Sequence, residues 1–301
     1  MKIIFMGTPD FAVYSLKALL DNHEISAVVT QPDKPRGRGK RVSFCPVKEI
    51  AADNKIPVIQ PEKIKSKGFY NQVKSYNADI FVVVAYGRML PEVILQMPKY
   101  GAVNVHASLL PKYRGAAPIQ WAIINGENKT GITIMQMDKG IDTGDMILKK
   151  EIPITGLDTG GSLHDKLART GAQALLEALA LIEKGEASWE AQDDSLASYA
   201  PMINKDTGCI NWNKNTDEII NLVRALNPWP GAYTMHNETQ LKIFSAAEYK
   251  GAFGKPGELS ISDSKELIIK TGDTGLLLKE VQRPGGKKMG SAAFLRGNRL
   301  S

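Results

Sequence analysis

Asn104, His106 and Asp142 are the residues whose types and spacing point most directly to chemistry. Asn104 and His106 stand two positions apart at the end of an apolar run, so in an extended strand their side chains project from the same side. Asp142 lies in the stretch Gly140-Ile141-Asp142-Thr143-Gly144, whose glycines allow a sharp turn. An amide, an imidazole and a carboxylate can together move an acyl group between amines, because two donate hydrogen bonds to an oxyanion and the third accepts a proton.

These residue types also have structural interpretations. His106 could end its strand through backbone hydrogen bonds alone, and an aspartate in a turn often bonds its own backbone. The turn interpretation fits Asp138 and Asp145 best, since they flank the glycine-rich loop. Ser108 lacks a Gly-x-Ser-x-Gly elbow, and Cys45 has no evident base partner. The sequence therefore favours direct attack by a substrate amine over a covalent enzyme intermediate.

The elements that must position these residues alternate between strands and helices. Apolar runs predict strands at residues 2–6, 25–30, 57–60, 80–85, 102–106, 130–137 and 146–154. Helical patterns fall at residues 11–20, 47–54, 69–76, 116–125 and 161–184. This order predicts an α/β fold with a Rossmann-like, doubly wound, mostly parallel sheet. Ligands of such sheets bind beyond the carboxyl ends of strands, where Asn104 and His106 fall.

The turn after the first strand argues against one common use of this fold. Gly7-Thr8-Pro9-Asp10 lacks the Gly-x-Gly-x-x-Gly phosphate fingerprint, and Pro9 suits the first turn of a helix. The sequence therefore disfavours a dinucleotide-binding oxidoreductase.

The pattern changes after about residue 206. A helix is predicted over residues 213–226 with Thr216 as its N-cap, followed by five short strands at 232–236, 240–246, 257–261, 266–271 and 275–282. Short strands separated by Gly, Asp and Asn turns are typical of a small antiparallel β-barrel, OB-like in size. We predict a catalytic domain over 1–187, a linker over 188–206 and the barrel domain over 207–301.

Composition is that of an ordinary globular protein, with 43% hydrophobic and 23% charged residues among 301. No apolar run approaches the ~20 residues of a membrane span, and the start has no signal-peptide cleavage site. The distant pair Cys45 and Cys209 suggests free thiols, and no Cys/His cluster has metal-ligand spacing. We expect a cytoplasmic monomer without a metal.

The net charge of +6 is unevenly placed. Residues 34–41 carry five basic groups and no acid, namely Lys34, Arg36, Arg38, Lys40 and Arg41. The last 20 residues again carry basic groups without an acid, namely Arg283, Lys287, Lys288, Arg296 and Arg299. One such cluster alone would suit a solvated loop or tail, but two of them favour a polyanionic partner such as nucleic acid.

The sequence resembles the folate-dependent formyltransferase superfamily, and within it the methionyl-tRNA formyltransferases. The resemblance spans the chain. It is carried by Asn104-Val105-His106-x-Ser108-Leu109-Leu110-Pro111, Tyr113-Arg114-Gly115, Gly140-Ile141-Asp142-Thr143-Gly144, Phe5-Met6-Gly7-Thr8-Pro9-Asp10-Phe11 and Thr30-Gln31-Pro32-Asp33.

The resemblance implies residue roles. Asn104, His106 and Asp142 would form the catalytic set. Ser108, Leu109, Leu110 and Pro111 would bind the folate, with residues 81–90 flanking its pterin. The basic stretch at 32–46 would be an inserted loop that contacts tRNA through Arg36, Arg38, Lys40 and Arg41, with Arg38 as the principal contact. Lys287 and Lys288 would contact tRNA from the barrel.

The resemblance also implies the reaction. The formyl group of 10-formyltetrahydrofolate would pass to the α-amino group of methionine on initiator tRNA, without a metal. The nearest alternative is formyl transfer to a small amine, such as glycinamide ribonucleotide or an aminosugar nucleotide. A hydrolase that releases formate and a non-catalytic RNA-binding protein are two others.

Overall fold

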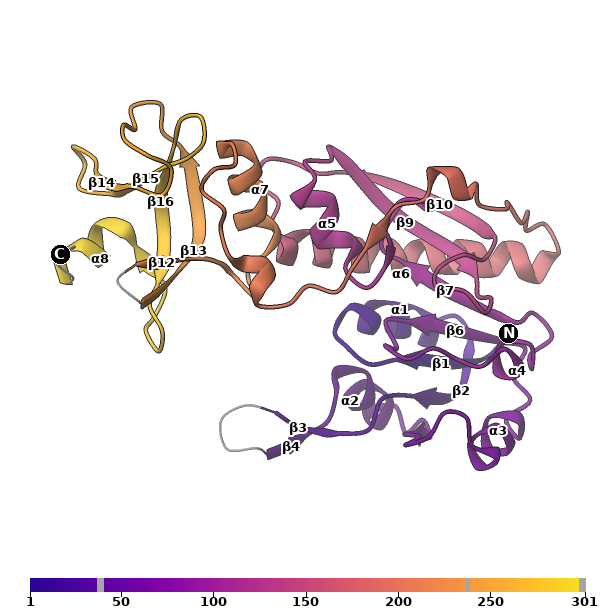
Figure 1. Cartoon of the computed structure of the whole chain (residues 1–301). Coiled ribbons are helices and arrows are strands. Elements are labelled where there is room, and N and C mark those ends of the chain that lie inside the picture. Colours follow the sequence, from indigo (N-terminus) through magenta and orange to yellow (C-terminus); the bar gives the residue numbers. More distant parts are fainter. Residues whose placement is uncertain (37–40, 237–238, 298–301) are drawn as a thin grey trace. The chain divides into compact units, whose positions relative to one another are not determined.

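The computed structural model describes residues 1–36, 41–236 and 239–297, which pack into two compact units (Figure 1). One unit contains Met1–Gly115, Thr130–Ile152 and His164–Tyr199. The other contains Ala116–Lys129, Pro153–Leu163 and the chain from Ala200 onward. The predicted boundaries at residues 187 and 207 follow the order of the chain, whereas these packing units interleave along it.

The first unit is built on a seven-stranded sheet in the order β10-β9-β7-β6-β1-β2-β5. These strands are β1 (Lys2–Gly7), β2 (Glu24–Val29), β5 (Val58–Ile59), β6 (Ile80–Val84), β7 (Ala102–His106), β9 (Lys129–Gln136) and β10 (Met146–Pro153). Strands β5, β2, β1, β6 and β7 pair in parallel, and β9 runs antiparallel to β7. The predicted doubly wound, mostly parallel fold is therefore confirmed.

Helices cover both faces of this sheet (Figure 1). They are α1 (Phe11–Leu20), α2 (Pro46–Asp53), α3 (Lys67–Lys74), α4 (Glu92–Leu95) and α6 (Gly160–Lys184). On one face, Phe69 of α3 and Ile94 of α4 share a buried cluster with Met6 and Val83. On the other, α6 lies so close to β7 that a Cβ at Gly171 would be 2.9 Å from the Val105 side chain. Continuous burial of β1 and β6 explains why their sequences are apolar without alternation.

The second unit contains an antiparallel six-stranded sheet that forms a half-barrel, and this confirms the predicted barrel-like fold (Figure 1). Its strands are β12 (Ala232–His236), β13 (Thr239–Glu248), β14 (Leu259–Ile261), β15 (Leu267–Lys270), β16 (Gly275–Gln282) and β17 (Met289–Gly290), followed by α8 (Ser291–Gly297). Helix α7 (Thr216–Ala225) packs its Ile219 and Val223 into the core of this sheet. Helix α5 (Pro118–Ile124) joins the same unit, where Ala117 and Trp121 contact Leu226 and its neighbours.

The predicted N-cap of α7 is wrong by one residue. The cap is Asn215, whose side chain accepts from the Glu218 N–H at 2.9 Å, while Glu218 accepts from the Asn215 N–H at 3.3 Å. Thr216 does not cap because its hydroxyl lies in a separate group with Thr271, Asp273 and Thr274.

The remaining elements are short. They are β3 (Lys34–Arg36), β4 (Arg41–Ser43), β8 (Arg114–Gly115), β11 (Tyr199–Ala200) and the 3-10 turns Asp194–Leu196 and Asp206–Gly208. Across the described ranges, we find no helix with the length and apolar character needed to cross a membrane.

Candidate active site

Strand β7 presents Asn104 and His106 on the face opposite α6. Val103 and Val105 are buried, and α6 covers the Val105 side. Because side chains alternate along a strand, Asn104 and His106 both point to the other face. Both lie in the carboxyl-terminal half of β7, in a mostly parallel sheet, as the sequence predicts.

Asp142 reaches the same place from the loop between β9 and β10. Its backbone is left-handed, with φ +55°. Gly144 lets this loop turn back on β9, since a Cβ there would lie 1.9 Å from the Gln136 carbonyl oxygen. Asp138 has the turn-forming role expected of it, because its carboxylate accepts from the Gly140 N–H at 2.9 Å and the Thr143 hydroxyl at 2.8 Å.

The three predicted catalytic side chains converge. The Asp142 Oδ2 lies 3.6 Å from His106 Nδ1, and Asn104 Nδ2 donates to Asp142 Oδ1 at 3.5 Å. The Gly115 backbone N–H donates to Asp142 Oδ2 at 2.9 Å. The His106 side chain is 5% exposed and that of Asp142 17%, so this carboxylate is the more accessible partner.

The second nitrogen of His106 sets the proton position on the ring. His106 Nε2 lies 3.0 Å from the carbonyl oxygen of Tyr113, which can only accept. Nε2 therefore donates, and a neutral ring keeps Nδ1 as the nitrogen that faces Asp142. The carbonyl that selects this tautomer belongs to a residue with φ +60°.

The predicted folate-binding residues form a tightly held turn directly after β7. The Ser108 hydroxyl donates to the Lys112 carbonyl at 2.6 Å, and Thr133 bonds both the Ser108 carbonyl and the Leu110 N–H. Ser108 is fully buried and Leu110 is 2% exposed, so their side chains support the turn from inside. Leu109 and Pro111 are half-buried and present the accessible side chains of the turn.

The predicted pterin-flanking stretch divides into two parts. Side chains from Phe81 to Val84 are buried in β6, whereas the loop from Ala85 to Leu90 follows its carboxyl end. Gln31 donates to the Tyr86 carbonyl at 2.9 Å and holds the start of this loop. Burial raises the pKa of the Tyr86 phenol. Met89 is a large apolar side chain of the loop that is 64% exposed.

The predicted tRNA-contacting residues lie in two places. Arg36 and Arg41 are backbone register partners in the antiparallel β3–β4 pair, while Arg38 and Lys40 lie outside the described residues. In the second unit, Lys287 is exposed, and the Lys288 ammonium lies 3.6 Å from the centre of the Phe244 ring and 3.9 Å from Glu280.

A polar network joins the base of this hairpin to the sheet. Asp33 accepts hydrogen bonds from Lys48 and from Gln60, and Gln60 also donates to the Gln31 carbonyl at 2.9 Å. Burial opposes ionisation of Asp33, but the Lys48 and Gln60 hydrogen bonds outweigh it and hold the pKa of Asp33 below its usual range. These hydrogen bonds hold the segment between β2 and β3, directly before the basic stretch.

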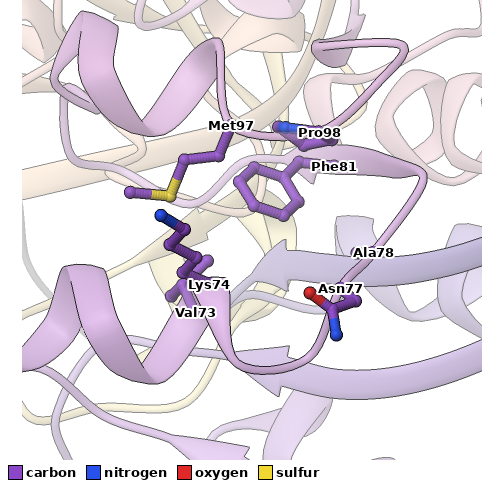
Figure 2. Close-up of a pocket in the computed structure, with 7 residues that line it drawn as sticks. All are labelled: Val73, Lys74, Asn77, Ala78, Phe81, Met97 and Pro98. Carbon is purple, nitrogen blue, oxygen red and sulfur yellow. The ribbon is translucent and has the colours of Figure 1, made fainter.

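A cavity of about 250 Å³ lies away from this site (Figure 2). It is lined by Val73, Lys74, Asn77, Ala78, Phe81, Met97 and Pro98. Asn77 and Ala78 precede β6, so the cavity is at the amino-terminal edge of the parallel strands, opposite the edge that carries Asn104 and His106. In the described portion of the chain, no group of three or more His, Cys, Asp or Glu residues could hold a metal ion.

Sequence reasoning missed four residues that contact the catalytic set or its supports. Tyr113 and Gly115 contribute backbone groups to His106 and Asp142. Gln192 donates to the carbonyls of Asp142 and Gly144, and Ser198 bonds the Tyr113 N–H. Tyr113 and Gly115 stand in a motif that carries the family resemblance, but their roles are missed because they act through backbone groups. No local pattern marks Gln192 or Ser198, because each bonds residues distant in sequence.

Two family models match the chain. One, described as "Formyl transferase", matches residues 1–179, and the other, "Formyl transferase, C-terminal domain", matches residues 202–299. A methionyl-tRNA formyltransferase from Clostridioides difficile strain 630 is 51% identical over 302 residues, covering 100% of this chain and 98% of the relative.

Solved structures show the same fold. HypX from Aquifex aeolicus in complex with tetrahydrofolic acid matches with a TM-score of 0.66 at 19% identity, over 98% of this chain and 47% of HypX. This chain thus corresponds to about half of HypX. An N-formyltransferase from Helicobacter canadensis, in complex with folinic acid and dTDP-3-aminofucose, matches with a TM-score of 0.68 at 24% identity, over 94% of this chain and 99% of that one.

Proposed function

This chain belongs to the formyl transferase family, in its methionyl-tRNA formyltransferase branch, and we propose that Asn104, His106 and Asp142 carry out its transfer step. The enzyme transfers the formyl group of 10-formyltetrahydrofolate to the α-amino group of methionyl-tRNA. The observation that supports the assignment of residues is the convergence of the Asn104 and His106 side chains on the Asp142 carboxylate, within 3.6 Å.

The attacking amine needs little activation. A free α-amine has a pKa of about 7.7–8.0, and an adjacent ester lowers it, so much of the amine is neutral near pH 7. The nitrogen attacks the formyl carbon, the carbonyl electrons move to oxygen, and the carbon becomes tetrahedral. What the enzyme must supply is stabilisation of the oxyanion and an acceptor for the proton leaving the nitrogen.

The catalytic set can supply both. The Asn104 amide is one donor to the oxyanion, and one such donor is typically worth about 10²- to 10³-fold in rate. The other is the Nδ1–H of His106 in the imidazolium form, in which Nδ1 has gained a proton from solvent and keeps it through the transfer, since Nε2 already donates to Tyr113. Asp142, the more exposed partner, takes the proton from the attacking nitrogen. When the tetrahedral carbon collapses, its bond to the folate nitrogen breaks and Asp142 passes its proton to that nitrogen, which releases tetrahydrofolate.

The turn of Ser108, Leu109, Leu110 and Pro111 is proposed to hold the folate beside this set. Its buried hydrogen bonds support the proposal, because they fix a turn whose half-buried Leu109 and Pro111 lie directly after His106. Met89, exposed at the carboxyl end of β6, would add an apolar surface for the pterin.

Further parts of the assignment concern the macromolecular partner. We propose that the acceptor is initiator tRNA, that Arg36, Arg38, Lys40 and Arg41 contact it from the 32–46 stretch, and that Lys287 and Lys288 contact it from the half-barrel. In this assignment residues 1–187 carry the chemistry, 188–206 link, and 207–301 bind tRNA. The charge of both basic clusters supports it. We also propose that the enzyme acts in the cytoplasm, where translation starts, as a monomer.

One assay tests the proposed function. The protein is incubated with 10-formyltetrahydrofolate and charged initiator tRNA, and the product is hydrolysed and examined for formylmethionine. Parallel reactions replace the tRNA with glycinamide ribonucleotide or an aminosugar nucleotide, or omit the acceptor. We expect formylmethionine in the first reaction alone. Formylation of a small amine, or release of formate without an acceptor, would overturn the assignment of the acceptor.

A further inference from the structure

The segment of residues 192–198 connects to both sides of the catalytic set. It follows α6 and contains the 3-10 turn Asp194–Leu196, capped by Asp193, whose side chain accepts from the Ser195 N–H. It lies in the same packing unit as Asn104, His106 and Asp142. The sequence predicts only a linker here, yet two residues of this segment, Gln192 and Ser198, form hydrogen bonds with the backbone around the catalytic set.

Gln192 holds the loop that carries Asp142. Its amide nitrogen donates to the Asp142 carbonyl at 2.9 Å and to the Gly144 carbonyl at 2.8 Å. Both of its amide protons are therefore used on the loop. The residue that they hold, Asp142, has a left-handed backbone, which residues other than glycine seldom adopt, although Asn and Asp do so more often than the rest.

Arg114 fixes which way the Gln192 amide points. The Gln192 Oε1 accepts from Arg114 Nε at 3.0 Å and from Nη2 at 2.8 Å. A flipped amide would place its NH₂ against the guanidinium and its oxygen against two carbonyls, so only one orientation is satisfied. Arg114 is 2% exposed and forms an ion pair with Asp194 at 2.7 Å, which compensates its buried charge.

Ser198 holds the other side of His106. Its hydroxyl accepts from the Tyr113 N–H at 3.0 Å, its carbonyl accepts from the Arg114 N–H at 2.8 Å, and its own N–H donates to the Pro111 carbonyl at 3.3 Å. Tyr113 also has a left-handed backbone, and its carbonyl is the acceptor for His106 Nε2.

From these contacts we infer that Gln192 and Ser198, near the two ends of the 192–198 segment, are positioning residues for catalysis: Gln192 places Asp142 at Nδ1 of His106, and Ser198 places the Tyr113 carbonyl at Nε2. The inference rests on the proposed roles of His106 and Asp142. Both nitrogens of the ring thus face residues whose uncommon backbone conformations are held by this one segment. Misplacement of a reacting group by about 1 Å can cost about 10²-fold in rate, so such supports affect turnover directly.

The experiment compares Gln192→Met, Gln192→Glu and Ser198→Ala in the full-length enzyme, with Ser195→Ala as the matched control. Ser195 is an exposed serine of the same segment whose hydroxyl bonds only Asp193 among the contacts described. We expect kcat to fall by about 10- to 100-fold in the three test variants, with KM for methionyl-tRNA and for 10-formyltetrahydrofolate unchanged. The control should keep the kcat of the wild type.

Gln192→Glu separates positioning from support of Arg114. A carboxylate still accepts from Arg114 but cannot donate to the Asp142 and Gly144 carbonyls. If Gln192 serves only to satisfy the buried guanidinium, Gln192→Glu keeps wild-type kcat, and the inference is overturned. If it acts through Asp142, Gln192→Glu is as impaired as Gln192→Met.

A double variant supplies a second test. In an Asp142→Asn background, Gln192→Glu should add little further loss, because residues that act as a unit are not additive. Full additivity of the two losses would overturn the inference even if the single variants lose activity. Formylation by the wild-type enzyme is the reference throughout, so its absence would count against the proposed function, whereas normal kcat in the variants counts against the positioning role alone.

Discussion

Asp142 combines an uncommon backbone conformation with hydrogen bonds on several sides. A left-handed conformation costs an L residue about 1–3 kcal/mol. The bonds from Gly115 to its carboxylate and from Gln192 to its carbonyl each contribute about 0.5–1.5 kcal/mol net, which is enough to offset that cost. Asp138, in the same loop, has a different role, since its carboxylate only accepts hydrogen bonds within the turn.

We predict that Asn104→Ala, His106→Ala and Asp142→Ala each reduce turnover by about 10²-fold or more, because each removes a group proposed to act on the transition state. Melting temperatures should change little, since none of the three side chains belongs to an apolar cluster. Steady-state formylation and thermal unfolding measure the two effects. Asp145→Ala, in an exposed aspartate of the same loop, is the matched control. Near-normal turnover in any of the three variants would remove that residue from the catalytic set.

Helix α7 and the turn between β15 and β16 are joined by polar contacts, in addition to packing. Asp273 accepts from the Thr216 N–H and hydroxyl, each at 2.9 Å, and from the Thr274 N–H at 2.8 Å. Burial alone would raise the pKa of Asp273, but the hydrogen bonds from Thr274, Thr216 and Thr271 lower it to about 2. The carboxylate thus satisfies a donor at the start of α7 that has no partner within the helix.

We predict that Asp273→Asn destabilises the protein in a pH-dependent way. The folded pKa of about 2 lies below the ordinary value of 3.8, so the ionised group contributes stability above about pH 4 and loses it as the pH falls toward 2. The difference in unfolding free energy between wild type and variant should be constant at neutral pH and shrink below pH 4. Chemical denaturation across this range measures it. A difference that is the same at every pH would show that the charge of Asp273 is not involved.

Over the whole molecule, chain order and packing do not coincide. Helix α5 comes before β9 in the sequence but packs with α7 in the second unit, through Ala117, Ile203 and Leu226. Arg224 of α7 also donates to the Thr155 carbonyl at 2.8 Å. Each unit therefore depends on segments that the sequence separates. Basic residues outnumber acidic ones, with 38 Lys and Arg against 32 Asp and Glu. The two basic clusters without an acid belong to different units.

We predict that Arg38→Ala raises KM for methionyl-tRNA because one phosphate contact is lost. For the same reason, the slope of log KM against log salt concentration should fall by about one. KM for 10-formyltetrahydrofolate should not change. Formylation rates at several salt concentrations provide both values, and Lys65→Ala, an exposed lysine outside the basic clusters, is the control. A change in folate KM with unchanged use of tRNA would show that this stretch has been assigned to the wrong substrate.

Many strands and helices of the fold can be predicted from local sequence patterns. Buried strands such as β6 are apolar throughout, and α6 follows a long helical pattern that ends before a glycine, so both could be placed in advance. The α7 cap was misplaced because Asn215 and Thr216 are both good capping residues. Asn215 is the cap because it forms a capping box with Glu218, and because the distant Asp273 accepts a hydrogen bond from the Thr216 hydroxyl.

The sequence by itself determined the candidate groups: the two-residue spacing of Asn104 and His106 at a strand end, Asp142 among glycines, and the motifs of the formyl transferase family. Only the tertiary structure decided that His106 turns Nδ1 toward Asp142 and Nε2 toward Tyr113, and that Gln192 and Ser198 hold those partners. The reason is physical. Strand and helix periodicity is set by neighbours along the chain, whereas side-chain hydrogen bonds between segments form only when the folded backbone brings distant residues within about 3 Å.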